Sequence, residues 1–219
     1  MEGRHASPLA PKTFRFSDVD QFRSSVRRLS VAFTPLVRKI SAEQTILNLP
    51  GCDVNYTKSF PRIIDAQLQP DCTAVAFNMD DGVPVRFNGV EETKPAIAIG
   101  TGGSFYTQVE KGPRSYVSII FSPTIENRGW FAPGPTWRFY VIGMPMLQRL
   151  RHLVLEVLAA AAELGDDPES FVVAGAMRES LLAAIDAALG DIVTAPQAMR
   201  LNFSSRFKAF RDAEAVLSE

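Results

Sequence analysis

The chain has 219 residues, of which 46% are hydrophobic and 21% charged, and its formal net charge is -1 at pH 7. This composition is ordinary for a globular protein with one domain or one domain plus a helical appendage. A charge so close to zero gives no basic field for nucleic acid or an anionic membrane, and no run of about 18 apolar residues is present to span a bilayer.

The chain opens with Met1–Lys12, a segment rich in Pro and Ala that lacks the apolar stretch of a secretory signal, and we predict a loose arm there. Ser17 and Asp20 then have the spacing of a capping box, in which each side chain reaches the other's backbone amide. Apolar residues follow at helical spacing, so a short helix is predicted to about Leu29.

Between Ser30 and Phe121 the apolar pattern changes to a period of two, interrupted by turn dipeptides that contain Pro, Gly or Asp. The predicted strands are Ala32–Ile40, Thr45–Leu49, Asp53–Ser59, Ile63–Gln67, Thr73–Met79, Val83–Phe87, Ala96–Gly100, Phe105–Val109 and Tyr116–Phe121. Asn88-Gly89 is the strongest hairpin signal, because both residues tolerate positive φ. The regular spacing, and a last strand that is apolar on both faces, predict a barrel or sandwich.

The pattern becomes helical after Gly143, which follows a connector containing a further predicted strand over Arg138–Ile142. One apolar stripe ends at Gly165, a typical residue beyond a helix end, and a second begins at Asp167-Pro168-Glu169, a typical helix start. The short link between them predicts an antiparallel helical hairpin. A third helix is predicted over Phe203–Leu217.

These elements divide the chain into an arm (1–12), a β-barrel (13–143), a helical hairpin (144–193) and a linker helix segment (194–219). Both helical stripes are wide and rich in Ala, so that one flank can pack on the barrel while the other meets a second copy. The residues predicted for this dimer interface are Leu150, Val154, Val157, Met177, Leu181 and Ile185. A purely intramolecular core is the alternative for the same stripes.

Metal and nucleophile chemistry have no support in the sequence. His5 and His152 are the two histidines, and neither has a second ligand at metal-binding spacing, although zinc sites take three or four protein ligands. A nucleophile needs an adjacent base, and no histidine lies on a predicted strand. Cys52 and Cys72 are expected to be reduced and partly buried. We therefore predict no catalytic residue, no metal and no cofactor.

Three other segments have a weak chemical signal. Gly100–Ser104 resembles a phosphate-binding loop but lacks its lysine, and a flexible connector is expected there. Asp80-Asp81 and Glu91-Glu92 flank predicted turns, where solvated charges are the default. What remains is binding without chemistry, since the mouth of a β-barrel is a common ligand cavity. The predicted ligand-binding residues are Asn55, Tyr56, Arg62, Asn78, Arg86 and Tyr106.

Three parts of the sequence resemble parts of one protein family. They are the opening helix Phe16–Phe22, the core stretches Leu68–Phe77, Phe87-Asn88-Gly89 and Pro95–Ala98, and the segment Phe203–Glu214. In these parts the chain is similar to the N-terminal regulatory half of AraC-type transcription regulators. Their counterparts there are a short first helix, a cupin-like core and the linker helix that precedes the DNA-binding half.

The resemblance implies an α+β fold: a cupin-like β-barrel or jelly roll with a short N-terminal helix, then an antiparallel helical hairpin and a C-terminal linker helix. It implies a cytoplasmic homodimer that binds a small-molecule effector, with DNA bound only through a C-terminal domain that is not present in this chain. The metal-binding histidines of cupin enzymes have no counterpart here. Two alternatives stay open: a metal-independent cupin-like isomerase or lyase, and a protein-interaction module without a small-molecule ligand.

Overall fold

The computed structural model describes residues 9–81, 84–123, 125, 128, 130, 135–164 and 170–194. The predicted helix over Phe203–Leu217 and the predicted helix boundaries at Gly165 and Asp167 lie outside these residues. The elements are β1 (Lys12–Phe16), α1 (Val19–Ser25), β2 (Leu29–Pro35), β3 (Ala42–Leu49), β4 (Cys52–Ser59), β5 (Arg62–Leu68), β6 (Thr73–Asn78), β7 (Val85–Phe87), β8 (Val90–Glu92), β9 (Ala96–Thr101), β10 (Phe105–Glu110), β11 (Arg114–Phe121), β12 (Trp137–Val141), α2 (Met144–Leu164) and α3 (Ser170–Thr194).

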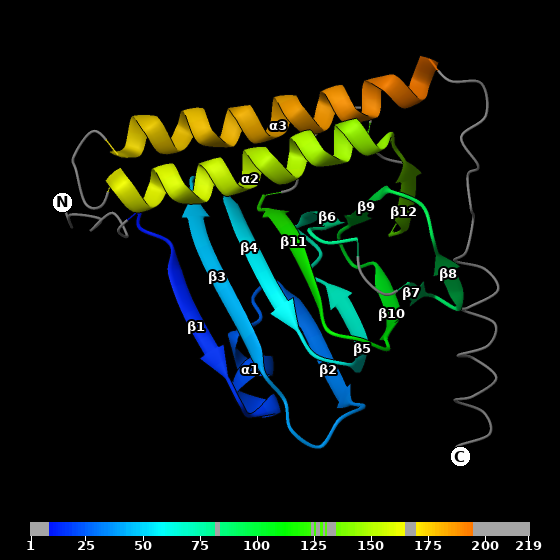
Figure 1. Cartoon of the computed structure of the whole chain (residues 1–219). Coiled ribbons are helices and arrows are strands. Elements are labelled where there is room, and N and C mark those ends of the chain that lie inside the picture. Colours follow the sequence, from blue (N-terminus) through cyan, green and yellow to red (C-terminus); the bar gives the residue numbers. More distant parts are fainter. Residues whose placement is uncertain are drawn as a thin grey trace.

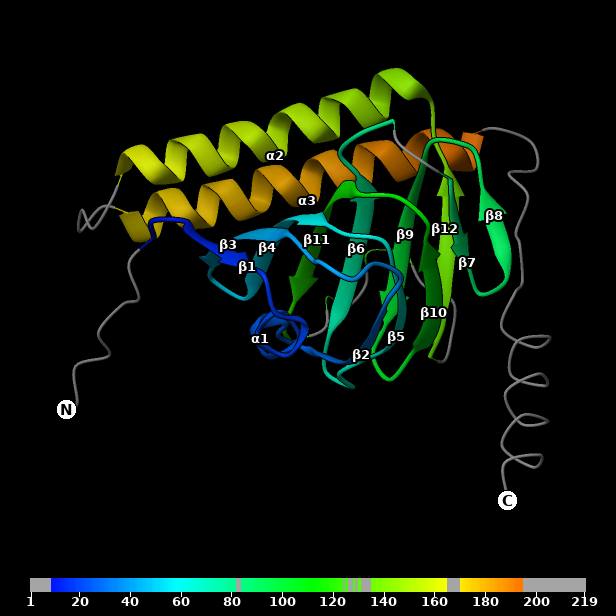
Figure 2. The same ribbon diagram turned by 60° about the horizontal axis from the view of Figure 1, so that its bottom comes forward.

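The strands form two antiparallel sheets that face each other. One sheet has the order β1-β3-β4-β11-β6-β9-β12, and the other has the order β2-β5-β10-β7-β8. The helices α2 and α3 lie side by side across the outer face of the larger sheet, while α1 lies away from them near the end of the sandwich (Figures 1 and 2). The predicted α+β class, with an antiparallel double-layered barrel followed by a helical hairpin, is confirmed.

The larger sheet is apolar on both faces, as its central strand β11 illustrates. Val117, Ile119 and Phe121 belong to the core shared with the helices, whereas Ile120 packs with Leu68 and other residues between the sheets. A strand that is covered on both sides loses the usual alternation of apolar and polar residues. This double coverage explains why the β11 sequence is almost uniformly apolar.

The apolar stripes of α2 and α3 bury their side chains in this single-chain core. The six residues that the sequence assigned to a dimer interface are all buried there: Leu150, Val154, Val157, Met177, Leu181 and Ile185. That assignment is corrected, because side chains already packed on the larger sheet are not available to a second copy. The exposed large apolar residues among the described parts of the helices are others, namely Met144, Leu155, Phe171 and Val172.

Leu181→Ala is expected to lower the free energy of unfolding by about 2–5 kcal/mol, because it leaves a cavity in a packed core. Leu181 is 1% exposed, whereas Leu155 is 47% exposed, so Leu155→Ala is the matched control with a change within about 0.5 kcal/mol. Urea denaturation measures both. A Leu181→Asp protein that stays folded and becomes monomeric would contradict the placement of Leu181 in the core.

The first helix differs from its predicted boundaries at both ends. Asp18, not Ser17, is the N-cap, and its Oδ1 accepts from the backbone amides of Asp20 at 3.0 Å and Gln21 at 2.9 Å. The helix ends at Ser25, because the next residue is already extended. The chain then enters β2, which the sequence analysis had placed three residues later.

The strand pairing is fixed in part by a tight hairpin. Asn88 and Gly89 have φ of 46° and 83°, as the predicted type I′ turn requires, and they join β7 to β8. The Asn88 backbone and side chain also bind Thr107 of β10, with a Thr107 amide to Asn88 Oδ1 distance of 2.8 Å. The turn therefore anchors the edge of the smaller sheet.

Candidate ligand-binding cavity

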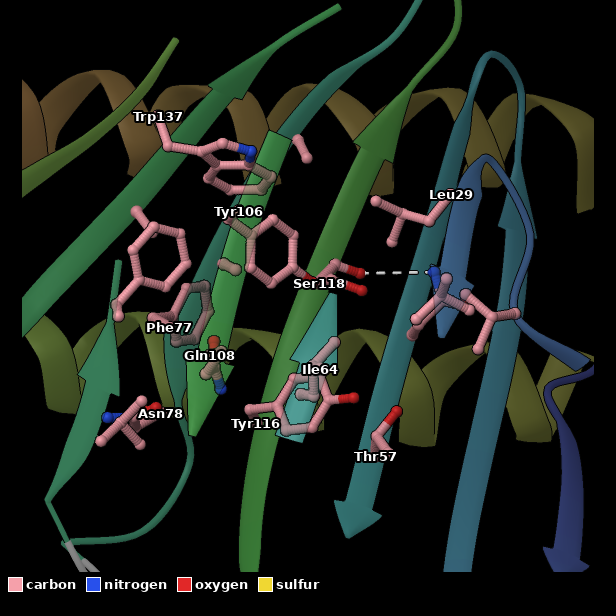
Figure 3. A pocket seen from close by; sticks show the side chains of 18 of the residues that line it. Leu29, Thr57, Ile64, Phe77, Asn78, Tyr106, Gln108, Tyr116, Ser118 and Trp137 are labelled. Atoms are coloured by element: carbon pink, nitrogen blue, oxygen red, sulfur yellow. Dashed lines mark hydrogen bonds between the residues drawn. The ribbon is translucent and has the colours of Figure 1, made fainter. Parts of the chain in front are cut away.

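A cavity of about 110 Å³ lies between the two sheets, and the inner face of the larger sheet forms one of its walls. Strand register places the side chains of that wall in rows that run across neighbouring strands, and two of these rows differ in chemistry. Figure 3 shows side chains of both sheets projecting into the shared space, with Asn78 and Thr57 on either side of Tyr116.

One row is made of small residues. Ser118 of β11, Ala76 of β6 and Ala98 of β9 are direct neighbours in register, with Asn55 at one end of the row and Phe139 at the other. Side chains of one or two heavy atoms cannot fill the space between sheets that pack about 10 Å apart. These short side chains are the structural cause of the cavity.

An adjacent row is polar. Gln44, Thr57, Tyr116 and Asn78 are register neighbours on four consecutive strands of the sheet order, and all four line the cavity. On the smaller sheet, Gln108 adds another carboxamide to the lining. The cavity therefore offers uncharged hydrogen-bonding groups along one side.

Aromatic rings close the other side. Phe87 and Tyr106 are stacked with centroids 5.0 Å apart, and Trp137 and Phe139 meet Phe87 edge to face at 5.9 Å and 4.6 Å. Burial raises the pKa of the Tyr106 phenol, which stays neutral. Trp137 lies directly over Gly100 of the neighbouring strand, where a Cβ atom would come within 2.6 Å of the indole. Glycine at this position therefore makes room for the indole between the sheets.

A buried ion pair stands beside the cavity. Arg62 Nε donates to Glu110 Oε2 at 2.9 Å, and the side chains of both residues are 0% exposed. Ser59 and Gln108 donate to the same carboxylate, at 2.9 Å and 2.7 Å. A buried carboxylate and guanidinium are tolerated only when paired and hydrogen-bonded in this way. Together, these four side chains hold β4, β5 and β10 in place relative to one another.

The guanidinium of Arg62 also connects to the polar row. Its Nη2 donates to the hydroxyl of Tyr116 at 3.0 Å, and the rings of Phe22, Phe33 and Phe60 surround it within 5.5 Å. Because the Tyr116 oxygen accepts from a cation, its own proton is directed elsewhere and polarised for donation. The hydroxyl is therefore a hydrogen-bond donor on the polar row.

The structure brings some of the predicted ligand residues together and separates others. Asn55, Asn78 and Tyr106 line the cavity. Arg62 lies next to it but is held by Glu110 and Tyr116. Tyr56 packs toward the helices on the opposite face of the sheet, and Arg86 is exposed between two buried neighbours.

Other lining residues were missed by the sequence analysis, although the sequence carries a signal for part of them. In Ala74-Val75-Ala76-Phe77 and Ala96-Ile97-Ala98-Ile99, small and large side chains alternate. The large members of both stretches are buried in the core shared with the helices, and the small members line the cavity, to which Phe77 also contributes. Strict alternation of alanine with a bulky residue thus marks a strand whose second face borders a space.

The described residues contain no cluster of three or more His, Cys, Asp or Glu side chains arranged to hold a metal ion. Cys52 and Cys72 are both unpaired and buried, and burial raises the pKa of each thiol, which lowers its reactivity. Asp81 pairs with Arg151, and the exposed His152 pairs with Glu156. None of the described helices is long and apolar enough to cross a membrane.

Comparison with solved structures identifies proteins with a similar fold. The fold is similar to that of the AraC-like transcriptional activator CuxR, with a TM-score of 0.53 and 11% sequence identity over 94% of this chain and 79% of that one. The expected fold of an AraC-type regulatory domain is thereby confirmed. Partial likenesses extend to KdgF from Halomonas sp. (TM-score 0.31, 13% identity, 43% of this chain and 88% of that one) and to the Clostridium difficile EutQ protein (TM-score 0.30, 9% identity, 41% and 68%). No family model and no curated protein matches the sequence.

Proposed function

We propose that this chain is the effector-sensing domain of an AraC-type transcription regulator, and that a small molecule binds between its two sheets. The observation that carries the proposal is the row of Ser118, Ala76 and Ala98, which leaves a space that polar and aromatic side chains line from both sheets. Sites for small molecules are usually apolar cavities with a few placed polar groups. The fold is similar to that of a transcriptional activator, so we propose that ligand binding regulates transcription.

A signal from the cavity can reach α2 through Arg151. The Arg151 Nε donates to the backbone oxygen of Asn78 at 2.7 Å, and its Nη2 donates to that of Asp80 at 2.8 Å. The Asn78 side chain lines the cavity. A ligand that displaces the end of β6 would therefore displace Arg151 as well, and with it α2. The effect is limited by the ligand's differential affinity for the two arrangements.

A second connection joins the cavity wall to α3. The indole of Trp130 donates to Asp186 Oδ1 at 2.7 Å, Arg128 pairs with the same carboxylate, and the Tyr140 hydroxyl donates to the Trp130 backbone oxygen at 2.7 Å. Tyr140 lies on β12, the strand that also carries Trp137. A movement of β12 on ligand binding would therefore be transmitted to the C-terminal half of α3.

We further propose that the domain forms a cytoplasmic homodimer, and that a separate helix-turn-helix unit of the regulator contacts DNA. The six buried helix residues cannot form the dimer contact, so the outer faces of the helices, where Leu155, Phe171 and Val172 are exposed, are the candidates. We propose no catalytic activity. The buried carboxylate nearest the cavity, Glu110, is committed to three hydrogen bonds and does not line the cavity.

Thermal unfolding against a library of metabolites tests the proposal. A ligand that binds only the folded state stabilises it by about 2.7 kcal/mol at a hundred times its Kd, which shifts the melting temperature of a domain of this size by several degrees. We expect at least one class of compound to give such a shift without being turned over. No shift from any compound would favour an interaction module, and reproducible turnover would favour an enzyme.

A further inference from the structure

We infer that the ligand of this cavity is a small planar aromatic acid, one ring in size, with its ring against the aromatic side and its carboxylate at the polar row. The inference rests on the proposed function, since it names the ligand class for the same site. It follows from three properties of the cavity: its volume, its shape and the sign of its charges.

The volume selects a single ring. The cavity measures about 110 Å³, and an engineered protein cavity of about 150 Å³ is known to hold benzene, whereas one water needs roughly 10–15 Å³. The space is therefore several times too large for one water. It is too small for a nucleotide or a disaccharide without rearrangement of the sheets.

The shape favours a flat molecule. The row of Ser118, Ala76 and Ala98 forms a low floor, and the rings of Tyr106 and Phe87 stand across from it on the smaller sheet. Aromatic rings pack best in offset or edge-to-face arrangements, which the four rings on this side already adopt with one another. A planar ring can extend this stack face to face, whereas a puckered saturated ring offers no flat face to it.

The charges select an anion over a cation. Among the described residues that line the cavity, the charged ones are Arg27 and Arg114, and none is acidic. The hydroxyl of Tyr116, which accepts from Arg62, provides a polarised donor next to Thr57, its register partner on β4 (Figure 3). A carboxylate gains a charge-assisted hydrogen bond at this position. An ammonium group would find no carboxylate among the described residues that line the cavity.

A cation held by the aromatic rings is the strongest rival, because aromatic cages bind ammonium groups. In this chain the cage of Phe22, Phe33 and Phe60 already surrounds a cation, the guanidinium of Arg62. The rings at the other side of the cavity, Phe87 and Tyr106, face each other rather than an open centre. The geometry thus favours a ring stacked on rings over an ammonium group enclosed by them.

Calorimetric titration of the unaltered chain with four probes tests the inference: benzoate, benzamide, benzylamine and cyclohexanecarboxylate. We expect benzoate to bind at least tenfold more tightly than benzamide, which keeps the ring and loses the charge. Cyclohexanecarboxylate is expected to bind more weakly than benzoate, and benzylamine not measurably. Benzylamine binding as tightly as benzoate would overturn the assignment of charge.

Tyr116→Phe is the variant that tests the donor. It should weaken benzoate about tenfold and reduce the preference for benzoate over benzamide, because it removes one hydrogen bond to a charged group. Tyr56→Phe is the matched control, since Tyr56 lies on the opposite face of the sheet, and it should leave both affinities unchanged. Because Tyr116→Phe also deprives Arg62 of an acceptor, its unfolding is measured in parallel, and the probe series on the unaltered chain does not depend on it.

The failure of this inference is distinguishable from that of the proposed function. If none of the four probes binds but another compound stabilises the domain in the library screen, the ligand class is wrong and the effector-sensing role stands. If no compound stabilises the domain at all, both the ligand class and the effector-sensing role are contradicted. If benzoate binds equally well to the unaltered chain and to Tyr116→Phe, the ligand does not use the polar row and the inference is overturned.

Discussion

Glu110→Ala is expected to lower the free energy of unfolding by about 3–5 kcal/mol, because it leaves the guanidinium of Arg62 buried without its counter-charge. Both side chains are 0% exposed, and the carboxylate also accepts from Ser59 and Gln108. Urea denaturation of the variant measures the effect. The loss should be among the largest that a single substitution produces in this domain, since it breaks an ion pair and two hydrogen bonds together.

Two comparisons make the result specific to the buried pair. Glu43→Ala removes the partner of Arg15 and Lys58 at the surface, where the ion pairs are solvated, and it should have a much smaller effect. The double variant Arg62→Met with Glu110→Leu should recover most of the stability, because apolar residues of similar volume often replace a buried ion pair without loss. A Glu110→Ala protein as stable as the unaltered chain would contradict the structure of this site.

Ala76→Leu is expected to weaken ligand binding by at least a hundredfold. Ala76 lies at the centre of the row of small side chains, between Ser118 and Ala98, so that three added carbon atoms occupy the space in which we place the ligand. The fold should tolerate the change, with a difference of less than about 1.5 kcal/mol in stability, because the added atoms enter an existing cavity rather than a packed core. Calorimetry with the most stabilising compound of the library measures the loss.

The control for this variant is Ala159→Leu, the same substitution at an exposed position of α2. It should leave both binding and stability unchanged. Binding that survives in Ala76→Leu would mean that the ligand lies outside the space between the sheets, for example on the outer surface of the helices.

Local features of the fold were predictable because they depend on neighbours in the sequence. Asn88-Gly89 forms its type I′ turn because both residues tolerate positive φ, and β11 is apolar on both faces because both faces are covered. The two long helices also lie where their stripes predicted them. The ends of α1 were less well predicted, because Ser17 and Asp18 are both acceptable caps and only the geometry selects between them.

The role of the helical stripes was not predictable from the sequence, because an apolar stripe has the same pattern whether it packs on its own sheet or on another chain. The wide apolar stripes on α2 and α3 suggested that each helix contacts a second chain as well as its own sheet. In the structure, residues of these stripes such as Leu150 and Ile185 are buried in the chain's own core. The number of apolar residues a helix can bury depends on the sheet beneath it. That area is known only once the strands are paired.

The candidate site was partly predictable from the sequence. The alternation of side chains along a strand predicts which face a residue lies on, but not which residues of other strands it meets. Arg86 stands between Val85 and Phe87, both buried, so the period of two already places it on the outer face. The pairing of Arg62 with Glu110 could not be anticipated, because the two residues are 48 positions apart and meet only through the order of the strands. A buried arginine without a known partner looks like a ligand residue.

The most direct test of a ligand site between the sheets is nuclear magnetic resonance of alanine methyl groups in the presence of the most stabilising compound. We predict that the largest shifts fall on Ala74, Ala76 and Ala98, whose side chains line the interior. The methyl signals of Ala174 and Ala188, which belong to α3 and are buried in the core shared with the larger sheet, should shift less. Shifts confined to the helical alanines, with the three interior methyl groups unchanged, would contradict the account.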